Sequence, residues 1–321
     1  MKYWNALLAG AALLLAACQS GKYELKFHPA DGAVYTLQAN SAGSVGLKLL
    51  GQTIETDFES SIISRAEFDT LPDGQTAVAF NYEEYKLGPT TVGTDSLRRT
   101  VTPLDDSVGR QMLNIIRQAR FSGRLNQQGK LVQKTGADSI WKAVEAALQP
   151  VEEPIRSQVA TALKPLLNDD MLVGVLDQAF YVLPGKRVDV GDKWRNQIRM
   201  QSVMNMTILN EFELLSVKNN VAEIAVKAKI TNTDSKVALS GLAMAGAPHG
   251  QHDTKNGFDI FGVKLEANFK GTQEGVVFVD MGTGMMQAAK LHQKLEGHFK
   301  FNSMEMPMVL DMKNEYKTAR R

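Results

Sequence analysis

The sequence predicts an α+β protein that is mostly antiparallel β, with two curved sheets or half-barrels forming a pseudo-repeat around a central helical insert. Apolar and polar residues alternate with a period of two soon after residue 22, give way to helical periods mid-chain, and alternate again from Trp194 onward. The predicted organisation is a signal peptide at 1–17, a tether at 18–22, a first β half at 23–135, the insert at 136–182 and a second β half at 183–321.

The N-terminus has the pattern of a secretory signal peptide. Lys2 precedes an apolar run over Ala6–Leu14, which is shorter than the roughly 20 residues of a membrane-spanning helix. The sequence Leu15-Ala16-Ala17-Cys18 resembles a bacterial lipobox, which implies cleavage before Cys18, lipidation of its thiol and acylation (palmitate) of its amine. The alternative is an ordinary signal peptide with a cysteine near the cut by chance. Gln19 in place of aspartate favours the outer membrane, with the protein lipid-anchored and facing the periplasm.

Charge and cysteine content exclude several classes of protein. Removal of residues 1–17 takes away one basic residue, Lys2, and leaves 35 basic and 35 acidic residues (36 − 1 against 35). A net charge near zero argues against nucleic acid as a partner. With the single cysteine lipidated, no disulfide, cysteine nucleophile or thiolate metal site remains.

The first β half begins with alternation over Tyr23–Phe27 and continues with a strand over Val78–Tyr82. Asp31-Gly32 and Pro72-Asp73-Gly74 supply turns between strands. A helical stripe covers residues 108–119, and a hairpin bent at Gln128-Gly129 follows it.

The insert contains three predicted helices. Asp138 is the expected N-cap of the first helix, Ser139–Leu148, whose apolar stripe includes Trp141. The second helix opens at Glu152, and the third opens at Asn168 and carries Leu172 and Leu176.

In the second β half, strands over Glu211–Leu215 and Val221–Ile230 flank a turn at Asn219-Asn220, and a long strand spans Met285–Phe301. Its order of motifs echoes the first half, which suggests the pseudo-repeat. The alternative is that twisted antiparallel sheets produce such echoes without repetition.

Two segments carry a family resemblance. The opening residues 23–35 and the stretch Leu183-Pro184-Gly185-Lys186-Arg187-Val188-Asp189-Val190-Gly191-Asp192-Lys193-Trp194, together with the lipobox, resemble an uncharacterised family of bacterial envelope lipoproteins, domain of unknown function 6263. This resemblance supports the architecture and brings no catalytic residues. The Gly- and Ala-rich segment Gly241–Gly250 departs from the family pattern.

No motif for catalysis stands out. The chain has no Gly-x-Ser-x-Gly elbow, no His-Glu-x-x-His pair and no phosphate-binding glycine loop. We therefore expect a protein that is not an enzyme, with no catalytic residues and no cofactor.

Two pairs of histidines are candidates for metal sites. His249 and His252, with Asp253, form the better candidate for zinc or copper, against the alternative of a polar loop. His292 and His298 are expected on the polar face of a strand, too far apart for one ion.

Methionines recur at every second position near the C-terminus, so on a strand their thioethers share one face; they are Met304, Met306, Met308 and Met312. Three interpretations stay open: a core face, the lining for a lipid-like ligand, or soft ligands for Cu(I). Trp141, Leu172 and Leu176 are the expected helical side of a ligand lining.

The function expected from these patterns is a non-enzymatic envelope lipoprotein that binds a hydrophobic, lipid-like ligand or an envelope partner. The alternatives are a structural or assembly accessory that docks on an outer-membrane protein, and periplasmic copper or zinc handling. The expected partners are a membrane, reached through the N-terminal lipid, and the ligand or an envelope protein.

Overall fold

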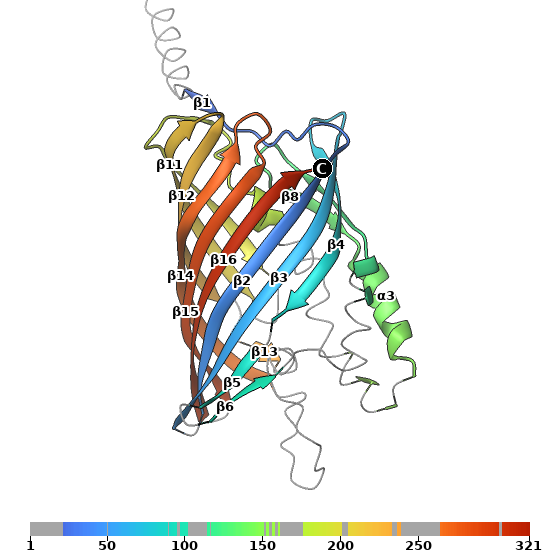
Figure 1. Ribbon diagram of the computed structural model, residues 1–321, viewed down its shortest axis with the longest axis vertical. Helices are drawn as coiled ribbons and strands as arrows, with labels where there is room; N and C mark the ends of the chain where they lie inside the picture. The colour runs from blue at the N-terminus through green and yellow to red at the C-terminus, as the bar shows by residue number, and fades with distance from the viewer. Residues whose placement is uncertain are drawn as a thin grey trace, which may run out of the picture.

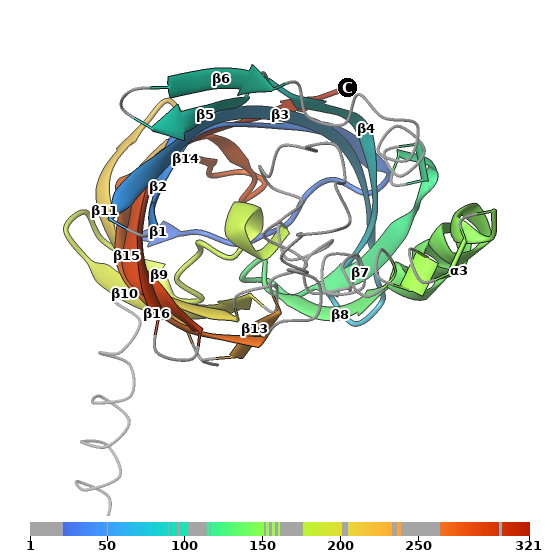
Figure 2. The same ribbon diagram turned by 90° about the horizontal axis from the view of Figure 1, so that it is seen from below.

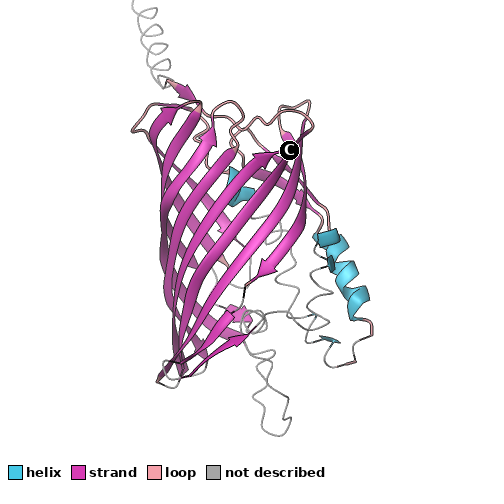
Figure 3. Ribbon diagram, in the orientation of Figure 1, coloured by secondary structure: helices cyan, strands magenta, loops and turns pink. Residues whose placement is uncertain are grey.

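A computed structural model of the 321-residue chain describes residues 22–49, 51–88, 90–94, 97–101, 114–115, 117–150, 152–153, 156–157, 160, 176–200, 205–232, 236–238, 264–301 and 304–321. Cys18 and the predicted signal peptide lie outside these residues. The structure is mostly antiparallel β, as the sequence predicts (Figure 3).

The main sheet contains 14 strands, and its principal path runs β10-β11-β12-β14-β15-β16-β2-β3-β4-β7-β8 (Figure 1). In chain order the strands of this sheet are β2 (Ala33–Leu49), β3 (Gln52–Thr70), β4 (Thr76–Leu87), β5 (Thr90–Thr94), β6 (Leu97–Val101), β7 (Phe121–Leu125), β8 (Leu131–Thr135), β10 (Lys193–Met200), β11 (Met206–Lys218), β12 (Val221–Asn232), β13 (Lys236–Ala238), β14 (Lys264–Asp280), β15 (Met286–Phe301) and β16 (Met304–Arg320). A second sheet pairs β1 (Tyr23–Glu24) with β9 (Arg187–Val188).

The prediction of two separate curved sheets is corrected by this topology. The last strand, β16, pairs with the first long strand, β2, from Met308↔Leu47 to Arg320↔Tyr35. This ladder joins the two predicted halves into one continuous sheet, which sequence periodicity does not reveal because it reports faces and not neighbours. The pseudo-repeat between the halves stays a prediction.

The sheet curves around a central space without closing on itself (Figure 2). We call the face that bears Tyr35 and Phe68 the inner face, because these residues pack against segments enclosed by the sheet. The cross-strand registers assign every other residue of each strand to this face. The opposite face is called the outer face.

Glycines on the inner face explain how long strands can curve so strongly. A Cβ at Gly271 would lie 2.1 Å from the Lys294 carbonyl oxygen, and one at Gly297 would lie 2.0 Å from the Asn268 carbonyl oxygen. The backbones of β14 and β15 therefore approach on this face more closely than any side chain permits. Register shifts in four ladders, such as the one between Phe278 and Val279, add to the bending.

A packed core fills the space at the end of the sheet where the C-terminus lies. The ring of Phe180 lies 5.2 Å from that of Phe27 and 5.7 Å from that of Phe68, measured between centroids. All three side chains are buried. Large aromatic side chains contribute much of the apolar area of a core, and these three join a helical turn, the segment after β1 and strand β3.

Residues 176–182, which we call the bridging segment, connect the two end strands of the sheet. On one side, the Asp177 carboxylate accepts a hydrogen bond of 2.8 Å from the backbone N–H of Leu131 in β8. On the other side, Trp194 Nε1 of β10 donates to the Val182 carbonyl at 2.9 Å, and the Asn196 amide donates to the Tyr181 carbonyl. These side-chain hydrogen bonds take the place of a backbone hydrogen-bond ladder between β8 and β10.

The predicted helical insert is described in part. Helix α3 (Ala137–Leu148) lies beside β7 and β8, outside the ring of strands in Figure 2, and contributes Ile140, Val144 and Leu148 to the core. Its N-cap is Gly136 and not Asp138, which lies in the first turn. An acidic group there still favours the helix through the dipole, although it makes no cap.

Several predicted turns are confirmed. Asn219 and Asn220 both adopt positive φ (50° and 63°) between β11 and β12, as a tight hairpin requires. The β7–β8 hairpin and the long strand β15 also lie where alternation predicts them. Among the described residues, no helix combines the length and the apolar character needed to cross a membrane.

Candidate functional site

The methionine face predicted from the sequence exists, and it belongs to the inner face. Met308, Met312 and Tyr316 of β16 pair with Leu47, Gly43 and Ala39 of β2, in register with the inward residue Tyr35. By the same alternation, Met304 and Met306 occupy inward positions nearer the start of β16. The four thioethers thus share one face with the core.

Burial along the inner face changes from one end of the sheet to the other. At the C-terminal end, inward residues such as Ala66 and Phe68 are fully buried. Further along the same strands, most inward side chains are still apolar, but they become only half-buried. These half-buried side chains are Val45, Leu47, Ile54, Phe58, Met306, Leu310 and Met312. We call this end of the inner face the methionine end.

On the neighbouring strands of the methionine end, apolar side chains are buried. The rings of Phe269 on β14 and Phe299 on β15 meet edge to face with centroids 4.9 Å apart. Leu295 and Ile230 are each 1 % exposed and form a second hydrophobic cluster with Ile208. The apolar surface that remains accessible is therefore concentrated on β16, β2 and β3.

A row of polar side chains separates the core from the methionine end. Cross-strand registers place the following residues in one row on the inner face: Asn196 of β10, Asn210 of β11, Gln273 of β14 and Gln293 of β15. On the next three strands the row continues one inward position nearer the core, through Asn314 of β16, Ser41 of β2 and Ser60 of β3. We call these seven residues the polar belt.

Some side chains of the polar belt hydrogen-bond to one another. Asn210 Nδ2 donates to Asn196 Oδ1 at 2.8 Å, and Ser41 Oγ donates to Asn314 Oδ1 at 2.6 Å. Gln293 is 8 % exposed, yet its amide makes no hydrogen bond with any other described residue. A cavity of about 20 Å³ beside the belt, lined in part by Gln178, Tyr181 and Gln273, has room for about one water.

Tyrosines on the inner face remain uncharged. Burial raises the pKa of Tyr316 to about 12, and burial also raises the pKa of Tyr82. Desolvation disfavours the phenolate, so both hydroxyls are neutral at any physiological pH.

The outer face carries charges in pairs. His292 Nε2 lies 2.6 Å from Asp311 Oδ1, and Arg195 forms a 2.6 Å ion pair with Glu211. The hydrogen bond from His292 lowers the pKa of the Asp311 carboxyl. His298 also occupies an outward position, so the prediction that both strand histidines lie on the polar face agrees with the register.

The metal-site candidates receive no support from the described residues. His249 and His252 lie outside these residues, and no group of three or more described His, Cys, Asp or Glu side chains is arranged to hold a metal ion.

The expected helical lining is placed only partly. Leu176 is buried in the core, and Trp141 is half-buried against it, so neither faces the methionine end. Leu172 lies outside the described residues.

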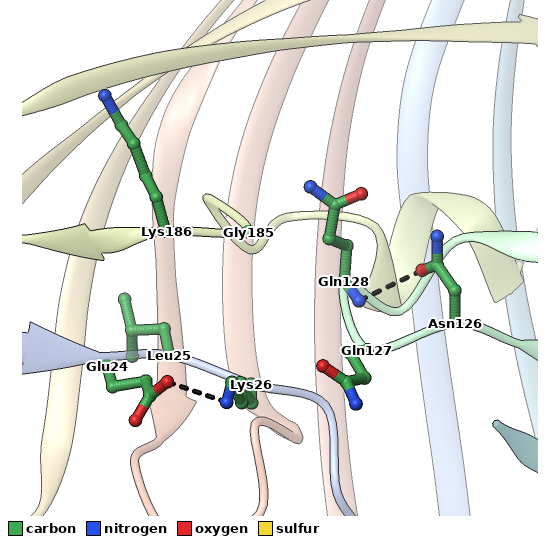
Figure 4. A pocket seen from close by; sticks show the side chains of 8 residues that line it. All are labelled: Glu24, Leu25, Lys26, Asn126, Gln127, Gln128, Gly185 and Lys186. Atoms are coloured by element: carbon green, nitrogen blue, oxygen red, sulfur yellow. Dashed lines mark hydrogen bonds and ion pairs between the residues drawn. The ribbon is translucent and has the colours of Figure 1, made fainter. Parts of the chain in front are cut away.

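A separate pocket of about 360 Å³ lies at the same end of the sheet as the C-terminus, between the segment after β1, the β7–β8 turn and Gly185-Lys186 (Figure 4). Glu24 and Lys26 form an exposed 2.7 Å ion pair at its rim, and this pair lowers the pKa of Glu24. The backbone N–H of Gln128 donates to Asn126 Oδ1 at 3.0 Å. The residues that line this pocket, mainly amides and one ion pair, include no nucleophile with an adjacent base.

A family of unknown function, DUF6263, matches residues 73–286, more than half of the chain, and the protein belongs to this family. No curated protein matches the chain.

Three solved structures resemble the fold distantly. Lipovitellin, in a structure titled for its lipid–protein interactions, is 10% identical with a TM-score of 0.46, over 91% of this chain and 26% of its own. An outer membrane channel from Pseudomonas putida F1 is 8% identical (TM-score 0.25; 92% and 98% of the two chains). The translocator domain of the autotransporter NalP from Neisseria meningitidis is also 8% identical (TM-score 0.21; 98% and 97%). The chain thus spans about a quarter of the lipovitellin chain, and TM-scores this low carry no argument about function.

Proposed function

We propose that this protein is a non-enzymatic envelope lipoprotein, anchored in the outer membrane through Cys18, that holds a hydrophobic ligand against the inner face of its sheet. The observation that carries the proposal is the change in burial along β16, β2 and β3. Past the polar belt most inward side chains are still apolar but, apart from the buried Met308, they are only half-buried or exposed. Apolar surface that a fold leaves accessible in a concave, organised array is typical of a binding site.

The composition of the lining supports a flexible, lipid-like ligand. Met306 and Met312 are half-buried on the inner face, and thioether side chains adapt to varied apolar shapes. Leu47 and Ile54 lie opposite each other on β2 and β3 and extend the same apolar surface. Covering such side chains would contribute about 25 cal/mol per Å² of apolar area removed from water.

Docking on a protein partner has less support. Six large apolar side chains are exposed among the described residues, namely Val132, Val190, Leu209, Leu215, Met304 and Val309. None of them faces another across a ladder, so these residues do not form a contiguous apolar patch on the outer face.

The test uses the full chain as a Cys18→Ser variant and the uncharged fluorescent probe N-phenyl-1-naphthylamine. We expect saturable binding with a blue-shifted emission. Met306→Glu places a charge among the inner apolar side chains and should weaken binding at least about tenfold, because an unpaired charge is costly in an apolar site.

Val309→Glu is the matched control, because Val309 lies on the outer face of the same strand and is 52 % exposed. It should bind the probe as the parent does, and circular dichroism should show the same fold for both variants. Absence of probe binding to the parent, or equal binding by Met306→Glu, would contradict the proposal. In parallel, mass spectrometry of protein released from native membranes should find a co-purifying lipid in near-stoichiometric amount.

A further inference from the structure

The inner face is almost free of charge. On the eight strands from β10 to β3 along the sheet, the described inward positions carry one charged residue, Arg320, which is exposed at the C-terminal rim. Lysines, arginines and acids of the same strands fall on the outer face, as with Lys290, His292 and Lys294 of β15. A charged lipid headgroup on the inner face would have no counter-charge near the polar belt.

The polar belt gathers hydrogen-bonding groups in a row across this face. Its members are two pairs of carboxamides, on β10 and β11 and on β14 and β15, which Ala228 of β12 separates, continued by a fifth carboxamide and two hydroxyls. Amides and hydroxyls both donate and accept, so they match esters, hydroxyls and amides without requiring an ion.

The belt also has unused capacity. The buried Gln293 amide makes no hydrogen bond with the rest of the described chain. The amide atoms of Gln293 keep some contact with solvent, so they can hydrogen-bond to a molecule from outside the chain. Beyond the belt, the inward side chains of the core are buried, and the cavity of about 20 Å³ there is too small for a hydrocarbon chain.

We infer, resting on the proposed function, that the ligand is a neutral amphipathic lipid whose ester or hydroxyl head hydrogen-bonds to the polar belt while its hydrocarbon chains extend over the methionine end. Gln293 and Gln273 contact the head, and Leu310, Met312 and Val45 lie along the chains. The belt thereby sets both the orientation of the lipid and its class.

Competition for bound N-phenyl-1-naphthylamine tests this inference on the full-length Cys18→Ser chain. The competitors are 1,2-dioleoylglycerol, dioleoylphosphatidylglycerol with the same chains, and the hydrocarbon 1-octadecene. Dioleoylglycerol should compete best, the phosphatidylglycerol at least about tenfold less well because its phosphate has no partner at the belt, and the hydrocarbon about fivefold less well because it makes no hydrogen bond.

Gln293→Leu should then weaken competition by dioleoylglycerol about fivefold and leave 1-octadecene unchanged. Gln38→Leu is the matched control, because it makes the same substitution on the outer face of β2, away from the polar belt. Equal competition by the phosphatidylglycerol, or a Gln293→Leu effect of the same size on both neutral competitors, would overturn the inference while probe binding still upholds the proposed function. Loss of probe binding in the parent chain would instead remove both.

Discussion

Asp177 is the buried carboxylate that ties the bridging segment to β8. Desolvation raises its pKa, and the hydrogen bond from the Leu131 N–H and the nearby Lys134 oppose this shift only in part. The folded state therefore holds the proton to a higher pH than the unfolded chain does. It follows that this group costs stability as the pH rises from about 4, the ordinary pKa of aspartate, through its raised value.

Asp177→Asn should remove that cost, because an amide oxygen still accepts from the Leu131 N–H but carries no charge. We expect the variant to be more stable than the parent at pH 7 and the two to converge as the pH falls below about 4. Urea unfolding at a series of pH values measures this difference. Asp177→Ala, which also lacks the charge but loses the hydrogen bond, should be less stable than Asp177→Asn by about 1–2 kcal/mol at both ends of the series. A constant gap between Asp177→Asn and the parent would show that the charge is not penalised.

Sequence reasoning reached some residues of the candidate site and missed others for a physical reason. The methionines of β16 repeat every second position, and a strand with this spacing must place them on one face. The polar belt has no such signature, because each strand contributes a single amide or hydroxyl. Asn210 and Gln293 become neighbours of other polar groups only through the registers of four ladders.

Strands and hairpins were the most predictable elements. Alternation in β15 and the Asn219-Asn220 turn each reflect local chemistry, so they appear in the sequence directly. The start of α3 was displaced because Gly136 supplies the cap position without a side-chain hydrogen bond. Curvature was not predictable, since it depends on inward glycines that meet the backbone of the adjacent strand.

Gly297 tests the contribution of these glycines. A Cβ at this position would lie 2.0 Å from the Asn268 carbonyl oxygen and 2.5 Å from Phe269 Cδ1, so β14 and β15 would have to separate. Gly297→Ala should lower the free energy of unfolding by about 3 kcal/mol, measured by urea denaturation. Gly46→Ala is the control, because its Cβ would meet nothing closer than Thr53 Cγ2 at 3.8 Å, and it should change stability by less than about 0.5 kcal/mol. Similar effects of both variants would mean that close backbone approach does not limit the curvature.

At the level of the whole molecule, the sheet depends on a contact between the two ends of the chain. The pairing of β16 with β2 brings residues near positions 40 and 314 together, and alternation within either strand carries no information about that partner. Periodicity therefore predicted the strands and their faces, while the single sheet emerged only in the assembled fold.

A ligand held on the inner face should stabilise the entire sheet, since the surface it covers is shared by β16, β2 and β3. At a free 1,2-dioleoylglycerol concentration about 100 times its Kd, the stability gain is about 2.7 kcal/mol, which corresponds to a rise in Tm of about 5 °C. Differential scanning fluorimetry of the Cys18→Ser chain measures the shift. Met306→Glu should show almost none of it, and an equal shift in that variant would place the bound lipid elsewhere.

The bridging segment also determines how the width of the curved sheet can change. A continuous ladder between β8 and β10 would have to lose a whole row of backbone bonds before the sheet could widen. Instead, side-chain hydrogen bonds span this seam: Asp177 bonds to β8, and Gln178, Trp194 and Asn196 bond between the bridging segment and β10. Releasing these bonds leaves every strand pairing intact, so the width of the molecule can change along this line without the loss of a ladder.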